Sequence, residues 1–286
     1  LKEGLIANKI SKIYGIFNGT SNYILSSMDK ENKNFKEVLL KAKKLGYAES
    51  NPSADLNGDD VSSKLKILSS LCFNSFLNDN VYVEGIKEID KTDIDYANKL
   101  GYKIKLLGFA ELLNNKIYQR VHPTLIKKES YVASIDGVLN AVIVDAIPVG
   151  QSSIQGEGAG AAATTSALVS DISSILRGNV KFPFSISSKE RKYLKFNKID
   201  ERLFSAYLRF EVLDKPGVLS NITNIFSKNK VSIKRLLQNP DKNKQGASII
   251  IVTHKSKNKF LTKILGEVTK KKYIKKKPKL IRIDEV

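Results

Sequence analysis

The chain has 286 residues, of which 42% are hydrophobic, and its formal net charge at pH 7 is +19. This length predicts one large or two ordinary domains with sizeable hydrophobic cores. A single cysteine excludes an internal disulfide framework, and no window approaches the roughly 18 consecutive apolar residues of a membrane span. We therefore expect a cytoplasmic protein with no membrane partner.

The positive charge is concentrated in the last third of the chain. Residues 201–286 contain 21 lysine and arginine residues against 7 aspartate and glutamate residues, and seven of the lysines lie between Lys270 and Lys279. No aromatic-rich basic strand of the kind that stacks nucleic-acid bases accompanies this run. We expect no nucleic-acid partner, and the sequence leaves the role of the run open.

The beginning of the chain differs from that of a complete secreted or membrane protein. The first residue is Leu1 rather than methionine, and the residues after it lack the apolar centre of a signal peptide. The chain reads as though preceding residues had been removed.

The first 178 residues alternate predicted strands and helices. Runs rich in Val, Ile, Leu and aromatic residues predict strands at 11–17, 81–89, 103–112, 116–126 and 137–146. Apolar periodicity, caps and glycine stops predict helices at 20–28, 34–45, 60–72, 92–100 and 161–177. Residues 179–203 are polar and charged, and we interpret them as a linker.

The helix at 60–72 carries a charged pair at its start. Two adjacent stripes are expected to face the core: Asp60, Lys64, Ile67 and Leu71 on one, and Val61, Leu65, Leu68 and Cys72 on the other. Asp60 and Lys64 then lie at the open end of an apolar face. Their spacing alone fits either an ordinary i,i+4 ion pair or a candidate site.

Residues 204–286 have their own order of elements. Strands are predicted at 206–213, 231–239, 247–254 and 279–286, with helices after Pro216 and over 257–271. This is the β-α-β-β-α-β order of a ferredoxin-like domain.

Two further signals are weak by themselves. Residues 156–161 (GEGAGA) fit G-x-G-x-x-G/A but lie late in their domain, so they do not open a complete dinucleotide-binding unit. The glycines either approach a cofactor or allow close helix packing. His122 and His254 are too far apart in sequence to suggest a metal site, and we expect His122 to be a hydrogen-bonded residue at a strand end.

Four motifs in order carry a resemblance to a known family. They are GIFNGTSNYIL (15–25), AKKLGYAESNPSADLNGDDVSSKLKIL (42–68), VHPTLI (121–126) and GEGAGAAATTSALVSD (156–171). Together they resemble homoserine dehydrogenase over residues 1–178, and D-x-P-G-V-L at 214–219 resembles the start of an ACT domain. The resemblance implies an α+β fold with a mixed or antiparallel sheet and helices on one face, followed by a ferredoxin-like ACT domain over 204–286.

Matching positions imply roles for individual residues. Lys64 matches the family's acid/base lysine, and Glu49 matches the carboxylate that binds the substrate's α-amino group. The other matches are Asp55, Asp60, Gly19 and Thr20 at the substrate, Gly158 and Gly160 at the nicotinamide cofactor, and Asp214 and Gly217 at a regulatory ligand. The implied reaction interconverts L-homoserine and L-aspartate 4-semialdehyde, in threonine, methionine and isoleucine biosynthesis.

The resemblance also implies partners. NADP or NAD would be the cofactor, although the nucleotide-binding segment that precedes these motifs in the family, and the metal-binding backbone within it, have no counterpart here. An amino-acid effector such as threonine and a homodimer or homotetramer are expected. The alternative is a non-catalytic, amino-acid-sensing ACT protein on a remnant dehydrogenase scaffold.

Overall fold

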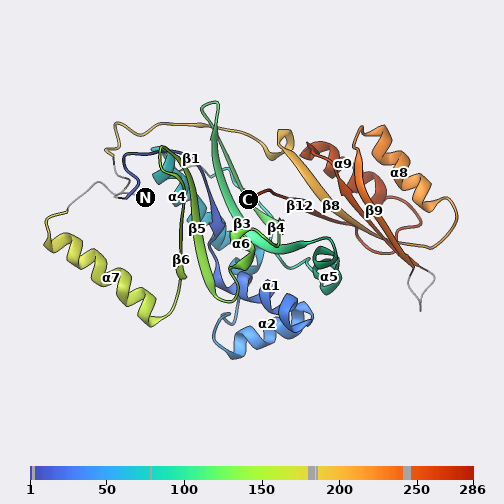
Figure 1. Cartoon of the computed structure of the whole chain (residues 1–286), viewed down its shortest axis with the longest axis horizontal. Helices are drawn as coiled ribbons and strands as arrows, with labels where there is room; N and C mark the ends of the chain where they lie inside the picture. Colours follow the sequence, from blue (N-terminus) through green and yellow to red (C-terminus); the bar gives the residue numbers. More distant parts are fainter. Residues whose placement is uncertain (2–3, 78, 180–183, 185, 241–245) are drawn as a thin grey trace. The chain divides into compact units, whose positions relative to one another are not determined.

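The computed structural model describes residues 1, 4–77, 79–179, 184, 186–240 and 246–286, and its fold is α+β. The chain divides into two compact units (Figure 1). The first contains Leu1–Pro123 and Lys127–Asn197, and the second contains Thr124–Ile126 and Lys198–Val286.

A mixed sheet forms the centre of the first unit. Its strands are β1 (Lys9–Ile16), β2 (Tyr82–Val83), β3 (Tyr102–Leu113), β4 (Lys116–Lys127), β5 (Leu139–Ile147), β6 (Gly150–Glu157) and β7 (Lys195–Phe196). The order is β6-β5-β1-β3-β4, with β1 antiparallel to both β3 and β5, while β2 and β7 pair in parallel with β4. Residues 104–111 of β3 are all buried, because this central strand is covered on both faces.

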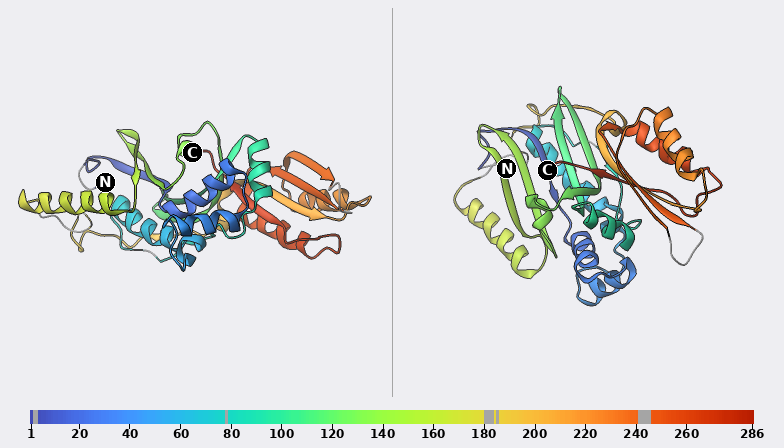
Figure 2. Two further views of the ribbon diagram at one scale, coloured as in Figure 1. Left: turned by 90° about the horizontal axis from the view of Figure 1, so that it is seen from below. Right: turned by 45° about the vertical axis from the view of Figure 1, so that its right-hand side comes forward.

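The first unit also contains helices. They are α1 (Gly19–Glu31), α2 (Phe35–Lys44), α3 (Ser53–Asn57), α4 (Asp59–Phe73), α5 (Lys91–Lys99), α6 (Tyr131–Ser134) and α7 (Ala161–Leu176). Of these, α1, α4 and α5 contact β3, while α7 has no buried residue and projects from the end of β6 (Figures 1 and 2).

The second unit has the predicted ferredoxin-like order. It contains a short 3-10 turn η1 (Ile199–Glu201), β8 (Leu203–Val212), α8 (Val218–Lys228), β9 (Ile233–Pro240), β10 (Ala247–Thr253), β11 (Ser256–Lys257), α9 (Asn258–Thr269) and β12 (Lys279–Ile283). The four main strands lie in the order β12-β8-β10-β9. Apolar faces of both helices form one core with them, including Phe210, Phe226, Ile249 and Ile264.

Three expectations about the elements need correction. The strand predicted at 81–89 is reduced to Tyr82–Val83, because the chain bends at Ile86 and turns at residues 87–88. The strand β6 was not predicted, since its sequence GQSSIQGE is polar and it is exposed along most of its length. Within the described part of residues 179–203, β7 and η1 are two short elements that the sequence did not predict.

No helix in the described part of the chain combines the length and the apolar character needed to cross a bilayer.

Candidate active site

A cavity of about 540 Å³ in the first unit brings the predicted site residues together. All eight residues that the sequence assigned to substrate or cofactor line it: Gly19, Thr20, Glu49, Asp55, Asp60, Lys64, Gly158 and Gly160. They come from the start of α1, the loop after α2, the helices α3 and α4, and the segment between β6 and α7. Residues that are spread over 142 positions of the sequence, from Gly19 to Gly160, thus meet in one cleft.

The start of α1 forms one wall of this cleft. Asn18 is the N-cap, and its Oδ1 atom accepts a hydrogen bond from the Ser21 amide at 2.8 Å. The Thr20 hydroxyl donates to the Tyr47 carbonyl at 2.6 Å and so ties the helix to the loop that carries Glu49. A Cβ atom at Gly19 would lie 2.6 Å from the Val138 carbonyl oxygen, so glycine is required for this close approach.

The joint between α3 and α4 brings two carboxylates to Asn18. Its Nδ2 atom donates to Asp55 Oδ1 at 2.7 Å and to Asp60 Oδ2 at 2.9 Å. Gly58 separates the two helices with φ 87°, in the left-handed region that favours glycine. This break turns the chain so that side chains on two short helices reach the same amide nitrogen.

Lys64 lies one helical turn after Asp60. Its Nζ atom donates to Asp60 Oδ2 at 2.8 Å and to the Phe17 carbonyl at 3.0 Å. A lysine ammonium has three donors, so one N–H remains for an oxygen atom in the cleft. The side chain keeps 47% exposure, and proton exchange with a bound molecule therefore needs no opening of the fold.

The expected burial of the whole Lys64 stripe was wrong. Ile67 is 50% exposed, and the side of α4 that faces the core consists of Val61, Leu65, Ser69 and Cys72. The apolar periodicity was too broad to separate the buried face from its margin, because leucine and isoleucine occupy both. Lys64 is therefore on the cleft side of the helix rather than at the end of a buried stripe.

Acidic groups outnumber basic groups in the cleft. Glu49, Asp55, Asp60 and Glu157 line it, against the one lysine, Lys64. Glu49 is exposed, and it makes no hydrogen bond to any other residue that the structure describes. This balance favours a ligand that carries an ammonium group.

The far wall consists of the glycine segment after β6. A Cβ atom at Gly158 would lie 1.6 Å from Asn140 Nδ2, whereas a Cβ atom at Gly160 would meet no atom within 4 Å. Gly160 has φ 102° and forms the N-cap of α7. The Asn140 Oδ1 atom is buried and has no hydrogen-bond partner among the described residues. Because Gly158 and Gly160 have no side chains, this segment leaves room in the cleft for a planar ring.

Sequence reasoning did not assign three residues that the cleft contains. Asn18 was identified only as part of the motif GIFNGTSNYIL (15–25), although an Asn immediately before a helix is a capping signal that would have placed its side chain at the helix start. Glu157 lies inside the glycine motif and could have been found there. Asn140 comes from the middle of the sequence, and no local pattern marks it.

The remaining candidates lie elsewhere. Asp214 and Gly217 line a separate cavity of about 420 Å³ in the second unit, together with Gln238 and Ile249. His122 is fully buried inside β4 rather than at its end, with Nδ1 3.0 Å from the Pro123 carbonyl oxygen and its ring stacked on Phe109. It does not line either cavity, so no role as a base follows from its position.

Comparisons with known proteins agree with this arrangement. Residues 1–173 match the family model for homoserine dehydrogenase, and residues 206–268 match the ACT domain. The chain is 38% identical over 297 residues to homoserine dehydrogenase of Neisseria gonorrhoeae, a match that includes 100% of this chain and 67% of the relative.

Solved structures show the same likeness. A homoserine dehydrogenase crystal structure from Thiobacillus denitrificans superimposes with a TM-score of 0.90 at 35% identity, covering 99% of this chain and 66% of that one. A hyperthermophilic archaeal homoserine dehydrogenase mutant in complex with NADPH matches 62% of this chain and 50% of that one, with a TM-score of 0.51 and 26% identity. The chain thus spans about two thirds of the length of the Neisseria and Thiobacillus proteins. Its sequence, its fold and its family match together show that it belongs to the homoserine dehydrogenase family.

Proposed function

We propose that this chain forms the substrate site of an NAD(P)-dependent oxidoreductase that interconverts L-homoserine and L-aspartate 4-semialdehyde. The observation that carries the proposal is the convergence of Lys64, Asp60, Asp55 and Glu49 on one acidic cleft. An amino acid with its hydroxyl group on C4 suits this cleft, because the acidic side chains can bind its ammonium group and Lys64 can bind its hydroxyl group.

Lys64 is the proton-transfer group of the proposal. Reduction of the aldehyde requires a proton at the carbonyl oxygen, which the Lys64 ammonium donates through its remaining N–H. Oxidation of the alcohol requires the reverse transfer to the neutral amine. A positioned acid or base of this kind accelerates a reaction by about 10²–10⁴-fold. The carbonyl of Phe17 and the carboxylate of Asp60 fix the direction of the amine.

Glu49 and the two aspartates orient the substrate. Glu49 is available to pair with the substrate ammonium, because it has no competing partner among the described residues. Asp55 and Asp60 are held by Asn18, and Asp60 in turn holds Lys64 at the hydroxyl end of the ligand. Holding the substrate at both ends reduces the entropic cost of the reactive geometry.

Gly158 and Gly160 fit the edge of a nicotinamide. The segment offers open space at Gly160, where an added Cβ atom would meet no atom within 4 Å, so a flat ring can approach its backbone. NAD(P) supplies the hydride acceptor or donor when it is bound. The archaeal relative is described in complex with NADPH, which supports a nicotinamide nucleotide, NAD or NADP, as the cofactor of this chain.

The test of the proposed reaction uses the product of the whole gene. We expect L-homoserine-dependent reduction of NAD(P), followed by absorbance at the nicotinamide band. Calorimetry of L-homoserine and of 4-hydroxybutanoate, which lacks the ammonium group, tests the acidic cleft. Homoserine should bind at least tenfold more tightly, and equal affinity would remove Glu49 from substrate recognition.

The second unit supports regulation by an amino acid. Asp214 and Gly217 lie at the start of α8 beside a cavity large enough for such a ligand. We propose residues 1–178 as the catalytic domain, 179–203 as the linker and 204–286 as the ACT regulatory domain, with threonine as the first effector to test. The single buried cysteine agrees with a cytoplasmic location.

We propose a homodimer or homotetramer as the assembly. In the described part of the second unit, β9 ends the strand order, and its Leu236 and Leu237 are partly exposed. An edge strand with apolar side chains favours pairing with another copy. Sedimentation of the purified protein tests this, and a monomer at micromolar concentration would contradict it.

The non-catalytic sensor remains the second candidate. The cavity at Asp214 and Gly217 favours it as much as it favours a regulated enzyme. The two differ in the first cleft, since a scaffold without a reaction needs neither the free donor of Lys64 nor the unpartnered Glu49. Threonine binding without any turnover of homoserine by the whole gene product would favour the sensor.

A further inference from the structure

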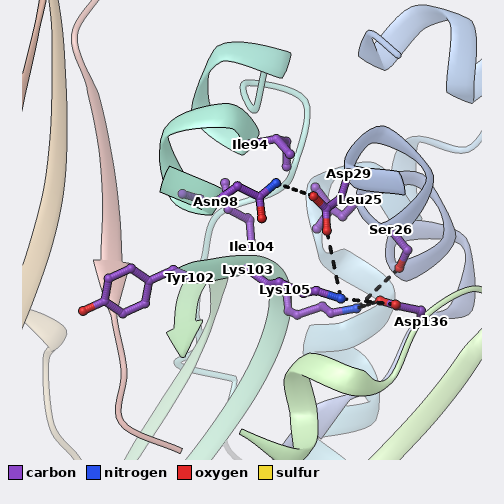
Figure 3. A pocket seen from close by; sticks show the side chains of 11 residues that line it. Leu25, Ser26, Asp29, Ile94, Asn98, Tyr102, Lys103, Ile104, Lys105 and Asp136 are labelled. Atoms are coloured by element: carbon purple, nitrogen blue, oxygen red, sulfur yellow. Dashed lines mark hydrogen bonds and ion pairs between the residues drawn. The ribbon is translucent and has the colours of Figure 1, made fainter. Parts of the chain in front are cut away.

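Lys105 is a buried charged residue that the proposed reaction does not use. It lies on β3, is 1% exposed, and belongs to a cluster of polar side chains between β3, α1 and the segment that precedes β5 (Figure 3). A buried ammonium is costly unless hydrogen bonds and an opposite charge compensate for its lost hydration. Its partners therefore show what the cluster holds in place.

The Lys105 ammonium joins two parts of the first unit. On α1, it donates to Asn22 Oδ1 at 3.0 Å and approaches Ser26 Oγ at 3.4 Å. On the segment before β5, it donates to the Ile135 carbonyl at 2.5 Å and to Asp136 Oδ1 at 2.7 Å. One side chain thus fixes the distance between a helix and a loop.

Asn22 extends this link along the loop. Its Nδ2 atom donates to the Ile135 carbonyl at 3.1 Å and to the Leu139 carbonyl at 3.0 Å. Asn22 is itself 1% exposed, so these bonds have no competition from water. The backbone at both ends of residues 135–139 is therefore attached to α1.

Both attached parts form walls of the substrate cleft. The first turn of α1 contributes Gly19 and Thr20, and the loop contributes Val138 and Asn140. Gly19 and the Val138 carbonyl are in such close contact that no side chain fits between them. A shift of the loop relative to α1 would change the width of the cleft beside Gly158.

We propose that Lys105 is a positioning residue that sets the width of the substrate cleft by clamping residues 135–139 to the first two turns of α1. This inference rests on the proposed function for its kinetic consequences, but the clamp itself does not depend on any ligand.

The surrounding charges make the clamp sensitive to pH. Asp136 also pairs with Lys103 at 3.3 Å and Lys30 at 3.1 Å, and Lys103 lies 4.0 Å from Asp29. Burial lowers the pKa of Lys105 to about 8, although the hydrogen bond and the charge of Asp136 act in the opposite direction. Tyr102 is the other titratable residue at this cavity.

Opening of the clamp would return Lys105 to water, where a lysine has a pKa of 10.5. Because its pKa is about 8 in the closed clamp, closing releases a proton and becomes more favourable as the pH rises from about 8 to 10.5. We therefore expect the affinity for L-homoserine to rise as the pH increases through about 8, the pKa of Lys105. The charges of Asp136 and Lys103 should shift the pH at which this change in affinity occurs, and they should shift it in opposite directions.

The experiment compares Lys105→Met, Asp136→Asn and Lys103→Met in the product of the whole gene. Lys105→Met should reduce kcat/KM by about tenfold to a hundredfold, mainly through KM, and should abolish the inflection. Asp136→Asn removes the carboxylate that keeps Lys105 protonated and should move the inflection to lower pH. Lys103→Met removes a like charge, should move it to higher pH, and should leave the activity at pH 7 unchanged.

The outcomes separate this inference from the proposed function. If the wild type is active but the inflection stays in place in both Asp136→Asn and Lys103→Met, the clamp has no role in the site. If Lys105→Met does not fold, these two variants still decide the question. If the wild type does not turn over homoserine, the proposed function is wrong, and hydrogen exchange decides the clamp. Amides of residues 135–140 should exchange at least tenfold more slowly at about pH 9.5 than at pH 7 after correction for intrinsic rates. Unchanged protection would overturn it.

Discussion

Asn18 Nδ2 lies 2.9 Å from Asp60 Oδ2, and the same oxygen atom accepts a hydrogen bond from Lys64 at 2.8 Å. The cap of α1 and the proposed proton-transfer group on α4 are thus connected through one carboxylate oxygen. Changes at any of the three residues should affect the other two, because Asn18 and Lys64 donate to the same Asp60 oxygen atom.

Replacement of Lys64 by alanine tests proton transfer. We expect kcat to fall at least a hundredfold, because the only lysine in the cleft would be lost. Steady-state kinetics with L-homoserine measures this. Lys66→Ala is the matched control on the same helix, since Lys66 pairs with Asp79 outside the cleft and its loss should leave kcat within twofold. Near-normal kcat in the Lys64 variant would remove it from the mechanism.

Replacement of Asn18 by alanine tests the connection between the helices. The variant loses the α1 cap and the donor shared by Asp55 and Asp60. The free energy of unfolding should fall by about 1–2 kcal/mol, and the KM for homoserine should rise as the two carboxylates separate. Urea unfolding and steady-state kinetics measure the two effects. Asn34→Ala, which caps α2 away from the cleft, should reduce stability alone.

A methyl group at Gly158 tests the proposed cofactor wall. Gly158→Ala would place its Cβ atom 1.6 Å from Asn140 Nδ2, so the asparagine must move into the cleft. The affinity for NADPH should fall by about tenfold or more, as measured by fluorescence titration. An added Cβ atom at Gly156 meets no atom within 4 Å, and Gly156→Ala should bind normally. Equal loss in both variants would indicate a general effect on the segment.

Gly217 tests the regulatory cavity. Its φ of 86° is unfavourable for alanine, so Gly217→Ala should distort the start of α8 and weaken threonine binding, measured by calorimetry. Gly266→Ala in α9 is the control: it has open space, should stabilise the helix by about 0.5–1 kcal/mol, and should bind as the wild type does. Absence of heat with threonine and related amino acids in the wild type would contradict regulation.

The pH dependence of stability tests the ionisation of Lys105. Its pKa is about 8 in the folded protein, against 10.5 for a free lysine. Between these values the unfolded chain binds more protons, so the free energy of unfolding should rise with pH, by up to about 3 kcal/mol relative to Lys105→Met. Urea unfolding from pH 7 to 10.5 measures the difference. A constant difference across this range would show that the ammonium is not destabilised by burial.

Asp136 should act at the opposite end of the pH scale. Burial raises its pKa, but hydrogen bonds and charges from Lys105, Lys30 and Lys103 outweigh this effect and lower it to about 2. The folded state then binds fewer protons than the unfolded state, so the stabilisation is lost as the pH falls below 4. In Asp136→Asn, the free energy of unfolding should therefore decrease less steeply as the pH falls below 4.

The sequence predicted the elements and most of the cleft for identifiable reasons. Strong periodicity and caps located α2 and α5, and the motifs around Glu49, Asp60 and Lys64 located the site. Asn140 and the Lys105 cluster could not be found in this way, because their meaning lies in contacts with residues more than 30 positions away. The exposure of Ile67 could not be predicted from the sequence, because an apolar residue predicts burial. The sequence does not show on which side of the helix a ligand cleft opens.

Gly58 gives the two aspartates a spacing that a continuous helix would not allow. Asp60 lies five positions after Asp55, a spacing that in an unbroken α-helix would point their side chains about 140° apart. The bend at Gly58 cancels that angle, and Val83 and Val121 lie 3.2 Å from where a Cβ atom would be. The position of Asp55 relative to Asp60 therefore depends on the bend at Gly58 and not on the regular spacing of one helix. A single inserted or deleted residue between the two aspartates would rotate one carboxylate out of reach of Asn18, even with every side chain of the site retained.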